Sequence, residues 1–337
     1  MGSATAITHH TIVVLEAVFS PIPEFKLPNG LTHTLISYPR TQPAQVAERI
    51  KDATILVTTT IALPAEVLSE DVSPHLQFIA VMAVGTDTID LEACRKRGIR
   101  VCNSVNANAS SVSEHAIGLY FAARRKLVET HMALRANEWP WRGTLINMLE
   151  DNTGTMPLTC EEEVMGLVGY GFIGKKIGNI ARMLGMKVLV ADRRGAKTIR
   201  EGYTAFEEVL KQSSVLVLIL PRTPDSINLI STPELKIMRP QAVLVNVSRG
   251  GIMDEAALVQ ALKEKWIAGA AVDVYATEPA GPETSPLATE DTKDLNLTLS
   301  PHTAWVSDTT LKNLERMVGE NVEGFCGGKI PAAHIVV

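Results

Sequence analysis

Hydrophobic and polar positions alternate in blocks along the first third of the chain. Short apolar runs rich in β-branched residues lie at 11–16 (TIVVLE), 33–38 (HTLISY), 55–60 (ILVTTT) and 78–84 (FIAVMAV), and they predict β-strands. Between them, segments such as PAQVAERIKD place apolar residues at helical spacing. Strands separated by helices form parallel sheets, so this part of the chain predicts an α/β domain.

A second and more regular alternation begins at Val164. Its apolar runs are VMGLVGY, KVLVAD, SSVLVLIL, AVLVNVS, GAAVDVY and LNLTLS. Near-continuous apolar strands joined by helices are typical of a doubly wound parallel sheet that is covered on both faces. Between the two alternations, residues 111–135 predict one long helix behind the capping residues Ser110 and Ser111. A last helix, over 307–326, is expected to return the chain to the first domain.

Length and composition narrow the class of protein. A chain of 337 residues is long for one core, so two domains are expected. A net charge of −5 gives no attraction to nucleic acid or to an anionic membrane, and we expect neither as a partner. The four cysteines show no zinc or disulfide spacing, and the stretch MGSATAITHHTIVVLEA shows no import signal. These features predict a cytoplasmic protein without a metal.

A glycine-rich loop, GYGFIG, follows the apolar run VMGLV and opens the amphipathic segment KKIGNIARML. Its three glycines allow a tight turn and a close approach of the backbone to a pyrophosphate, and a helix N-terminus adds free N–H groups and a positive dipole. The motif alone also occurs in simple turns, but a strand before it and a helix after it favour a dinucleotide site. The candidate cofactor-binding residues here are Gly169, Tyr170, Gly171, Phe172, Ile173 and Gly174.

The next apolar run ends at Asp192, which lies 18 residues beyond the last glycine (192 − 174). An acid near this distance binds the ribose hydroxyls of NAD, and its charge repels the 2′-phosphate of NADP. Arg193 and Arg194 follow directly, however, and guanidinium groups are what a 2′-phosphate would bind. The sequence therefore favours NAD and leaves NADP open.

Three polar residues follow apolar runs of the second alternation. They are Arg249 in NVSRGG, Glu278 in ATEP and His302 in SPHTAW. Each has a plain structural alternative, as a turn cation, a loop acid and a helix-entry residue. Because the carboxyl ends of parallel strands face the ligand crevice, we expect the three to converge there. Together they suit carbonyl reduction: His302 donates a proton, Glu278 favours the imidazolium, and Arg249 holds a carboxylate and the carbonyl oxygen.

With these residues in place, the sequence resembles the D-isomer-specific 2-hydroxyacid dehydrogenases, a family that includes glycerate, formate, D-lactate and phosphoglycerate dehydrogenases. The resemblance covers about residues 50–330. Its most specific stretches are VMAVGTDTIDLEACRKRGIRVCNS, NANASSVSEHAIGLYFAARRK, the glycine loop, LPRTPDSINLI, MRPQAVLVNVSRGGIMDEAALVQAL, GAAVDVYATEP and SPHTAW. It implies a flavodoxin-like substrate-binding domain, 1–110 with 303–337, and an NAD(P)-binding Rossmann domain, 111–302, inserted into it.

The resemblance also implies roles for single residues. It implies the catalytic roles given above for Arg249, Glu278 and His302. Backbone N–H groups near Val84 and Gly85 would grip the substrate carboxylate, with Asn108 nearby, and Asp273 would contact the nicotinamide carboxamide. The other cofactor-binding candidates are Leu220, Pro221, Thr223, Val247, Ser248, Arg249 and His302, and the other substrate-binding candidates are Thr60, Arg249, His302 and Trp305. A homodimer with helix 111–135 at its interface is implied as well.

Substrate choice depends on few residues. PHTAW resembles the glycerate dehydrogenase and hydroxypyruvate reductase branch, and the small polar Thr59 and Thr60 suit a hydroxymethyl side chain. We therefore predict reversible reduction of hydroxypyruvate or glyoxylate to D-glycerate or glycolate. A D-lactate-type reaction, 2-ketogluconate and bulky 2-oxo acids are alternatives, and so is a non-enzymatic, NADH-sensing protein of the corepressor type.

Other residues receive different interpretations. Arg222 stands where the family often has a hydrophobic residue, and it either reaches a phosphate of the cofactor or faces solvent. For His115, in SVSEHAIGLY, a structural hydrogen bond is the favoured interpretation. Trp139 and Trp141 are expected to anchor their loop or a dimer contact. Segment 142–163 is longer than in many members, and the sequence assigns it no role.

Overall fold

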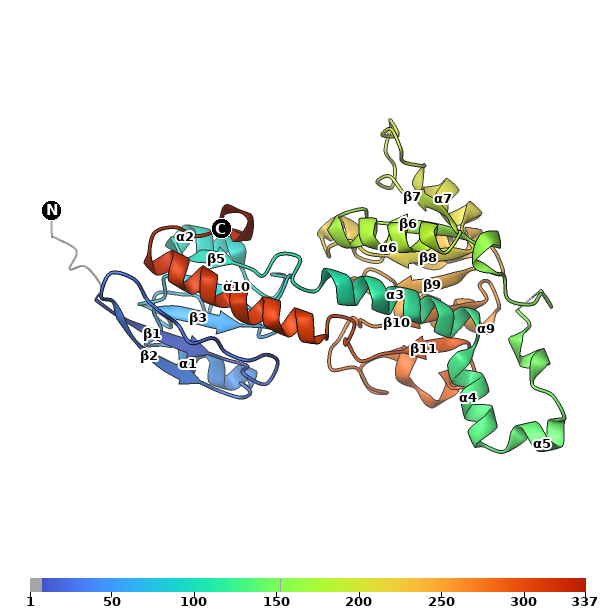
Figure 1. Ribbon diagram of the computed structural model, residues 1–337, viewed down its shortest axis with the longest axis horizontal. Coiled ribbons are helices and arrows are strands. Elements are labelled where there is room, and N and C mark those ends of the chain that lie inside the picture. Colours follow the sequence, from blue (N-terminus) through green and yellow to red (C-terminus); the bar gives the residue numbers. More distant parts are fainter. Residues whose placement is uncertain (1–7, 152) are drawn as a thin grey trace. The chain divides into compact units, whose positions relative to one another are not determined.

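The computed structural model describes residues 8–151 and 153–337; residues 1–7, part of the stretch expected to lack an import signal, lie outside this range. The chain divides into two compact units (Figure 1). The first unit contains the residues up to Asn108 together with Val306–Val337, and the second contains Ala109–Trp305. The divisions thus lie at 108/109 and 305/306, whereas the sequence analysis placed them at 110/111 and 302/303.

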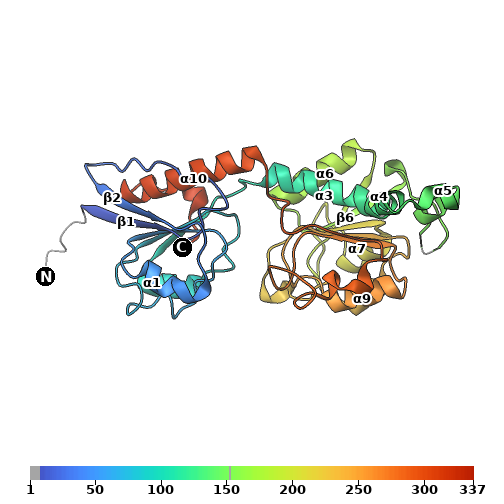
Figure 2. The same ribbon diagram turned by 90° about the horizontal axis from the view of Figure 1, so that it is seen from below.

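The first unit is built on a five-stranded parallel sheet with the order β2-β1-β3-β4-β5. This is the flavodoxin-like order, in which the chain reverses direction across the sheet after its second strand. Helices α1 and α10 lie on opposite faces of the sheet (Figure 2). The elements are β1 (His9–Val14), β2 (Thr32–Ser37), α1 (Val46–Ile50), β3 (Ile55–Thr58), β4 (Phe78–Val81), α2 (Leu91–Arg97), β5 (Arg100–Cys102) and α10 (Asp308–Cys326).

The second unit is built on a six-stranded parallel sheet with the order β7-β6-β8-β9-β10-β11. The strand order reverses between β6 and β8, which is where open α/β sheets bind ligands. Its elements are α3 (Ala109–Arg124), α4 (Leu127–Arg135), α5 (Glu138–Arg142), β6 (Val164–Val168), α6 (Phe172–Met183), β7 (Lys187–Val190), α7 (Phe206–Gln212), β8 (Val215–Leu218), α8 (Thr232–Ile237), β9 (Val243–Asn246), α9 (Glu255–Lys263), β10 (Gly269–Val272) and β11 (Leu297–Leu299).

Each face of the second sheet has its own hydrophobic core. Buried side chains of α3 and α6 pack on one face, and those of α7, α8 and α9 pack on the other. Figure 2 shows α3 and α6 on one side of this sheet and α9 on the opposite side. Strands β8, β9 and β10 are buried at every position, as expected for parallel strands covered on both sides. The predicted fold class, two doubly wound α/β domains with one inserted into the other, is confirmed.

The prediction of one helix over 111–135 is wrong. The segment forms α3 and α4, and between them Lys126 adopts the left-handed conformation with φ 47°. A non-glycine residue in this conformation ends a regular helix. The break changes the surroundings of the chain: ten residues of α3 are buried, but Ala133 is the one buried residue of α4. Helices α4 and α5 extend away from the rest of the second unit (Figure 1).

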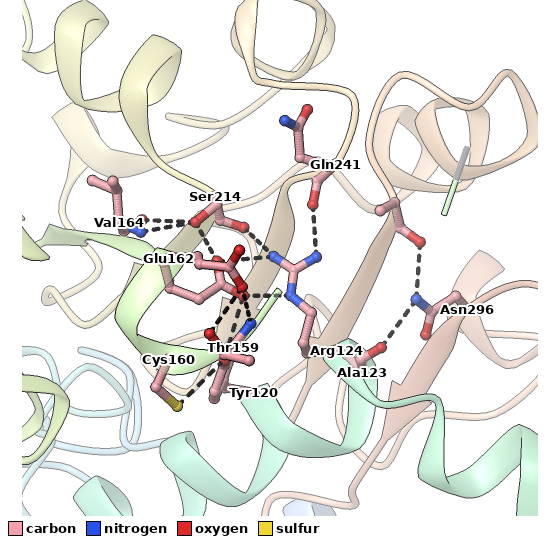
Figure 3. Close-up of polar contacts among 12 residues, drawn as sticks. Tyr120, Ala123, Arg124, Thr159, Cys160, Glu162, Val164, Ser214, Gln241 and Asn296 are labelled. Atoms are coloured by element: carbon pink, nitrogen blue, oxygen red, sulfur yellow. Dashed lines mark hydrogen bonds and ion pairs between the residues drawn. The ribbon is translucent and has the colours of Figure 1, made fainter. Parts of the chain in front are cut away.

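A buried polar cluster fixes the end of α3 to the sheet (Figure 3). The Nε atom of Arg124 lies 2.6 Å from Oε1 of Glu163, and both side chains are almost fully buried. Arg124 also donates to the backbone oxygens of Gln241 and Ser214, at 2.8 Å each. The hydroxyls of Tyr120 and Ser214 donate to Glu163. These contacts join α3 to the amino ends of β6, β8 and β9, opposite the edge where a ligand is expected.

No helix within residues 8–151 and 153–337 is both long and apolar enough to cross a membrane. Within the same ranges, no three His, Cys, Asp or Glu side chains gather as a metal site.

Candidate active site

The predicted site residues of the second unit lie at one edge of its sheet. The strands are parallel, so the residues that follow them meet at the same edge. Gly169 to Gly174 follow β6; Asp192, Arg193 and Arg194 follow β7; Leu220, Pro221 and Thr223 follow β8; Val247, Ser248 and Arg249 follow β9; Asp273 and Glu278 follow β10; His302 and Trp305 follow β11. The candidates Thr60, Val84, Gly85 and Asn108 lie in the first unit.

Two glycines of the loop after β6 are required by its shape. Gly169 has φ 104°, and a Cβ atom there would lie 2.1 Å from the backbone oxygen of Ile219, which follows β8. A Cβ atom on Gly174 would lie 2.5 Å from the backbone oxygen of Gly169. These distances leave no room for a side chain, so the loop folds tightly at the reversal point of the sheet.

The middle glycine has a different role. Gly171 precedes the first residue of α6, and a Cβ atom there would meet nothing within 4 Å. The space in front of the helix N-terminus is therefore open, and a ligand in it can reach the backbone N–H groups of the first turn. Phe172 is exposed, whereas Tyr170 and Ile173 pack against the core, so no side chain of the loop supplies a competing charge. This cradle fits the pyrophosphate of a dinucleotide.

Asp192 is buried at the end of β7 and carries a contact that the sequence analysis missed. Its carboxylate pairs with Arg200, whose Nη2 atom lies 2.6 Å from Oδ1. The hydrogen bonds from the Arg200 side chain and backbone N–H hold the pKa of Asp192 well below its usual range. The side chain of Arg193 is exposed, and Arg194 pairs with Glu234 at 2.8 Å.

Local contacts fix the shape of the loop after β8. Thr223 precedes a short turn, and its backbone N–H donates to Oγ of Ser226 at 2.7 Å. Leu220 packs against the core. The guanidinium of Arg222 lies about 3.6 Å from where a Cβ atom on Gly251 would be, so it covers the turn after β9. Arg222 is thus exposed and also lies against the turn after β9, and its role toward a cofactor phosphate stays a prediction.

Arg249 is placed by a close contact between two loops. Ser248 is buried and donates to the side-chain oxygen of Asn246 at 2.7 Å, and Arg249 donates to the backbone oxygen of Ser248 at 2.8 Å. A Cβ atom on Gly250 would lie 1.7 Å from the backbone oxygen of Tyr275. Only glycine lets the segment after β9 approach the segment after β10 so closely, and this approach sets Arg249 beside the loop that carries Glu278.

His302 and Glu278 form a direct pair. Nδ1 of His302 lies 2.6 Å from Oε2 of Glu278, and the two side chains are 39% and 33% exposed, so ligand can reach them. Oε1 of Glu278 accepts the backbone N–H of Tyr275 at 2.9 Å. Burial alone would raise the pKa of Glu278, but the hydrogen bonds from His302 and Tyr275, with the charges of His302 and Arg249, hold it below its ordinary value. The other two predicted catalytic residues, His302 and Arg249, therefore both act on the Glu278 carboxylate.

The backbone of His302 is strained and anchored. Its φ is 52°, a left-handed conformation that is uncommon for a non-glycine residue. The N–H of His302 donates to the backbone oxygen of Asp273 at 2.8 Å. The buried carboxylate of Asp273 accepts the N–H groups of Thr303 and Ala304, at 2.9 and 3.0 Å. Asp273 thus fixes the loop that presents the imidazole.

Two further contacts extend this anchor. The hydroxyl of Ser300 donates to Asp273 at 2.5 Å, and Nε2 of His115 lies 3.0 Å from the same hydroxyl. His115 therefore has the structural hydrogen bond that the sequence favoured. Trp305 is partly buried against the core of α3 and α6, and its backbone oxygen accepts the hydroxyl of Ser111 at 3.0 Å.

Two buried glutamates, which sequence reasoning missed, organise loops near predicted site residues. Glu255 accepts the N–H of Ala276 and the hydroxyl of Ser285, at 2.6 Å each, and so holds the loop that contains Glu278. In the first unit, Glu16 accepts the N–H groups of Thr59 and Thr60 at 2.8 and 2.9 Å, and the Thr60 hydroxyl. For Glu255 the sequence gives a weak signal, because MDEAAL places this acid directly after the capping residue of a helix. For Glu16, at the end of TIVVLE, the sequence gives no signal.

The second unit matches a known family of domains. Residues 117–304 match the model of the D-isomer specific 2-hydroxyacid dehydrogenase NAD binding domain, which covers more than half of the chain. The chain belongs to the D-isomer-specific 2-hydroxyacid dehydrogenase family. It is accordingly an NAD(P)-dependent oxidoreductase, and the family that the sequence motifs indicated is confirmed.

Relatives of this dehydrogenase carry related names. Glycerate dehydrogenase of Methylorubrum extorquens is 36% identical over 319 residues, 93% of this chain and 95% of that protein. Glyoxylate reductase of Thermococcus litoralis is 33% identical over 303 residues, 87% of each. The structure of NADPH-dependent glyoxylate/hydroxypyruvate reductase from Sinorhizobium meliloti, in complex with NADP and malonate, is similar with a TM-score of 0.77, 26% identity and 97% of both chains covered.

Proposed function

We propose that this dehydrogenase reduces hydroxypyruvate or glyoxylate to D-glycerate or glycolate, and that the reaction is reversible. The observation that carries the proposal is the His302–Glu278 pair at 2.6 Å, on the same sheet edge as Arg249 and a glycine loop shaped for pyrophosphate. An imidazole paired with a carboxylate is a general acid and base, and a nearby guanidinium binds carboxylates. The names of the relatives support this substrate class.

Each residue of the set has a distinct role in the reaction. Nδ1 of His302 contacts Glu278, so the other ring nitrogen, Nε2, gives the proton to the carbonyl oxygen of the substrate. The carboxylate of Glu278 stabilises the imidazolium and fixes the orientation of the ring. Arg249 binds the substrate carboxylate and stabilises the charge that develops on the carbonyl oxygen. A nicotinamide cofactor held at the glycine loop would supply the hydride to the carbonyl carbon, while His302 gives the proton to the carbonyl oxygen.

The remaining residues bind the two ligands. The backbone of Gly169 to Gly174 holds the pyrophosphate, and Asp192 faces the adenosine ribose. Asp273, besides its anchoring contacts, is assigned to the nicotinamide carboxamide. The other candidates after β8 and β9, and the substrate contacts of Thr60, Val84, Gly85, Asn108 and Trp305, stay predictions of the sequence analysis.

Substrate choice is tested by a panel of 2-oxo acids. We expect the highest kcat/KM with hydroxypyruvate or glyoxylate, and lower values with pyruvate, phenylpyruvate and 2-ketogluconate, measured as initial rates of NADH and NADPH oxidation. The proposed substrate class would be wrong if phenylpyruvate or 2-ketogluconate were preferred by tenfold or more.

Replacement of Glu278 by glutamine should narrow the pH range of reduction. The amide keeps the size of the side chain but removes the negative charge beside His302, so we expect the alkaline limb of the kcat profile to move to lower pH. Glu208→Gln is the control, because it removes an acid of the same unit that pairs with Lys211 and does not contact His302. An unchanged alkaline limb in Glu278→Gln would show that the His302–Glu278 pair does not control the proton transfer to the substrate.

The same pair contributes to stability in a defined pH range. The pKa of Glu278 is lowered in the folded protein, relative to about 4.3 for an unfolded chain. The contribution is therefore fully present above that pH, and it is lost as the pH falls through the lowered folded value.

We also propose that the enzyme is a homodimer that uses α4, α5 and the residues after them. The exposed apolar side chains of this segment are Leu127, Val128, Met132, Leu134, Trp139, Trp141 and Ile146. Large apolar side chains that are exposed together in one segment are typical of an interface. We expect sedimentation at twice 36.5 kDa, and a shift toward monomer in Trp141→Glu, whose side chain is 69% exposed. A wild-type monomer at micromolar concentration would refute the dimer.

A cytoplasmic location completes the proposal. The four cysteines are unpaired, and burial raises the pKa of Cys94, Cys102 and Cys326 to about 11. These thiols stay protonated and unreactive near neutral pH, as suits a reducing compartment.

A further inference from the structure

The acid that the sequence assigns to the adenosine ribose is already occupied by other groups. Oδ1 of Asp192 accepts the backbone N–H of Arg193 at 2.8 Å and Nε of Arg200 at 2.9 Å, and Nη2 of Arg200 also lies 2.6 Å from it. Oδ2 accepts the backbone N–H of Arg200 at 2.8 Å. Three of these four contacts converge on Oδ1, which has about two acceptor positions, and Oδ2 keeps one position. A ribose diol that places one hydroxyl on each carboxylate oxygen can therefore bind Asp192 only by displacing a donor from Oδ1.

The four contacts are not equally replaceable. The two backbone N–H groups belong to a loop that is tied to the sheet: the N–H of Asp192 donates to the backbone oxygen of Thr204, and the N–H of Thr204 donates to that of Val190, at 2.8 Å each. The side chain of Arg200, in contrast, is 55% exposed and has several rotatable bonds. The contacts that a ligand can displace are therefore those of the Arg200 guanidinium.

The surroundings keep this guanidinium at the site when it leaves Asp192. Its central carbon lies 3.8 Å from the centre of the Tyr203 ring, a cation–π contact. Tyr203 in turn packs edge-on against Tyr170 of the glycine loop, with 6.3 Å between the ring centres. Other cations follow β7, but Arg194 is engaged by Glu234. Arg200 is therefore a cation whose side chain links Asp192 to Tyr203, beside the glycine loop.

We propose that Arg200 is the residue that determines cofactor specificity, and that it lets this enzyme accept NADPH as well as NADH. With the free ribose diol of NADH, the hydroxyls compete with Arg200 for Asp192. With the 2′-phosphate of NADPH, Arg200 turns from Asp192 to the phosphate and compensates the carboxylate charge that would otherwise repel it. This inference rests on the proposed placement of the adenosine at Asp192.

The test uses ligands that cannot turn over, so that binding alone is measured. We would titrate ADP-ribose and 2′-phospho-ADP-ribose into wild-type enzyme and Arg200→Met by calorimetry. The substitution removes the competitor for the diol and the partner of the phosphate. We expect the affinity for 2′-phospho-ADP-ribose to fall roughly tenfold and the affinity for ADP-ribose to rise several-fold, two changes of opposite sign. Lys197→Met is the matched control, because it removes an exposed cation of the same loop that does not contact Asp192, and it should leave the ratio within about twofold. Arg193→Met tests the neighbouring guanidinium, whose residue contacts Asp192 through its backbone N–H.

Parallel losses of both affinities in Arg200→Met would overturn the inference, because they would show that Arg200 only supports the loop. A large change of the ratio in Arg193→Met alone would overturn it in favour of the neighbour. Asp192→Asn separates the inference from the proposed site: if ADP-ribose binding were unaffected, the adenosine would lie elsewhere, and the proposed placement would fail with it. Weaker ADP-ribose binding in Asp192→Asn, together with the opposite changes in Arg200→Met, supports both.

Discussion

His302→Ala is expected to lower kcat for 2-oxo acid reduction by roughly 10²–10⁴-fold, the contribution of a positioned general acid. The alanine variant has no group that can give a proton to the carbonyl oxygen as the hydride arrives. The imidazole is 39% exposed and contacts Glu278 at the surface of the sheet edge, so its loss opens no cavity in the core. Stopped-flow and steady-state kinetics with hydroxypyruvate measure the effect.

The affinity for NADH is the control in this experiment. Because His302 acts on the substrate carbonyl, the dissociation constant of NADH, measured by fluorescence, should change by no more than a few-fold. A catalytic role is supported when kcat falls and cofactor binding persists. Turnover within tenfold of the wild-type value would refute the role of His302 as the acid.

Arg124→Met is expected to destabilise the second unit by about 3–5 kcal/mol, because it leaves the buried carboxylate of Glu163 without its cation. Arg124 also satisfies the backbone oxygens of Gln241 and Ser214, which join β8 and β9 to α3 (Figure 3). Urea denaturation followed by circular dichroism measures the loss. Each unit has its own core, so the transition of the second unit is analysed separately from that of the first.

A double substitution distinguishes an unpaired charge from lost packing. Arg124→Met with Glu163→Met removes both charges and fills the site with apolar atoms, and we expect it to recover much of the lost stability. If the double variant is no more stable than Arg124→Met, burial of an unpaired carboxylate is not the main cost of the single substitution.

Much of the fold could be predicted from the sequence, because its strands have patterns that can be recognised within each segment. Buried parallel strands such as β8 and β9 must be apolar at every position, so their pattern is visible without knowledge of their neighbours. The glycine loop could also be predicted, because the lack of room for a side chain at Gly169 and Gly174 appears in the sequence directly as glycine. Pairing of His302 with Glu278 could also be expected, since both follow strands of one parallel sheet.

The features that could not be predicted depend on partners distant in the sequence or on tertiary contacts. Arg124 and Glu163 are 39 residues apart, and each resembles an ordinary surface charge in its own segment. The break at Lys126 has no glycine or proline to signal it. The pairing of Asp192 with Arg200 depends on a loop whose course is not encoded in any periodic pattern.

The most direct test of the proposed function is the product itself. Purified enzyme would be incubated with hydroxypyruvate and NADH or NADPH, and the amount and handedness of the glycerate formed would be determined by chiral chromatography, with His302→Ala as the control. The proposed function predicts D-glycerate in a one-to-one ratio with the oxidised cofactor, and almost none from the variant. L-Glycerate, or NADH binding without any product from hydroxypyruvate or glyoxylate, would contradict it, and the second result would favour a cofactor-sensing protein of the same fold.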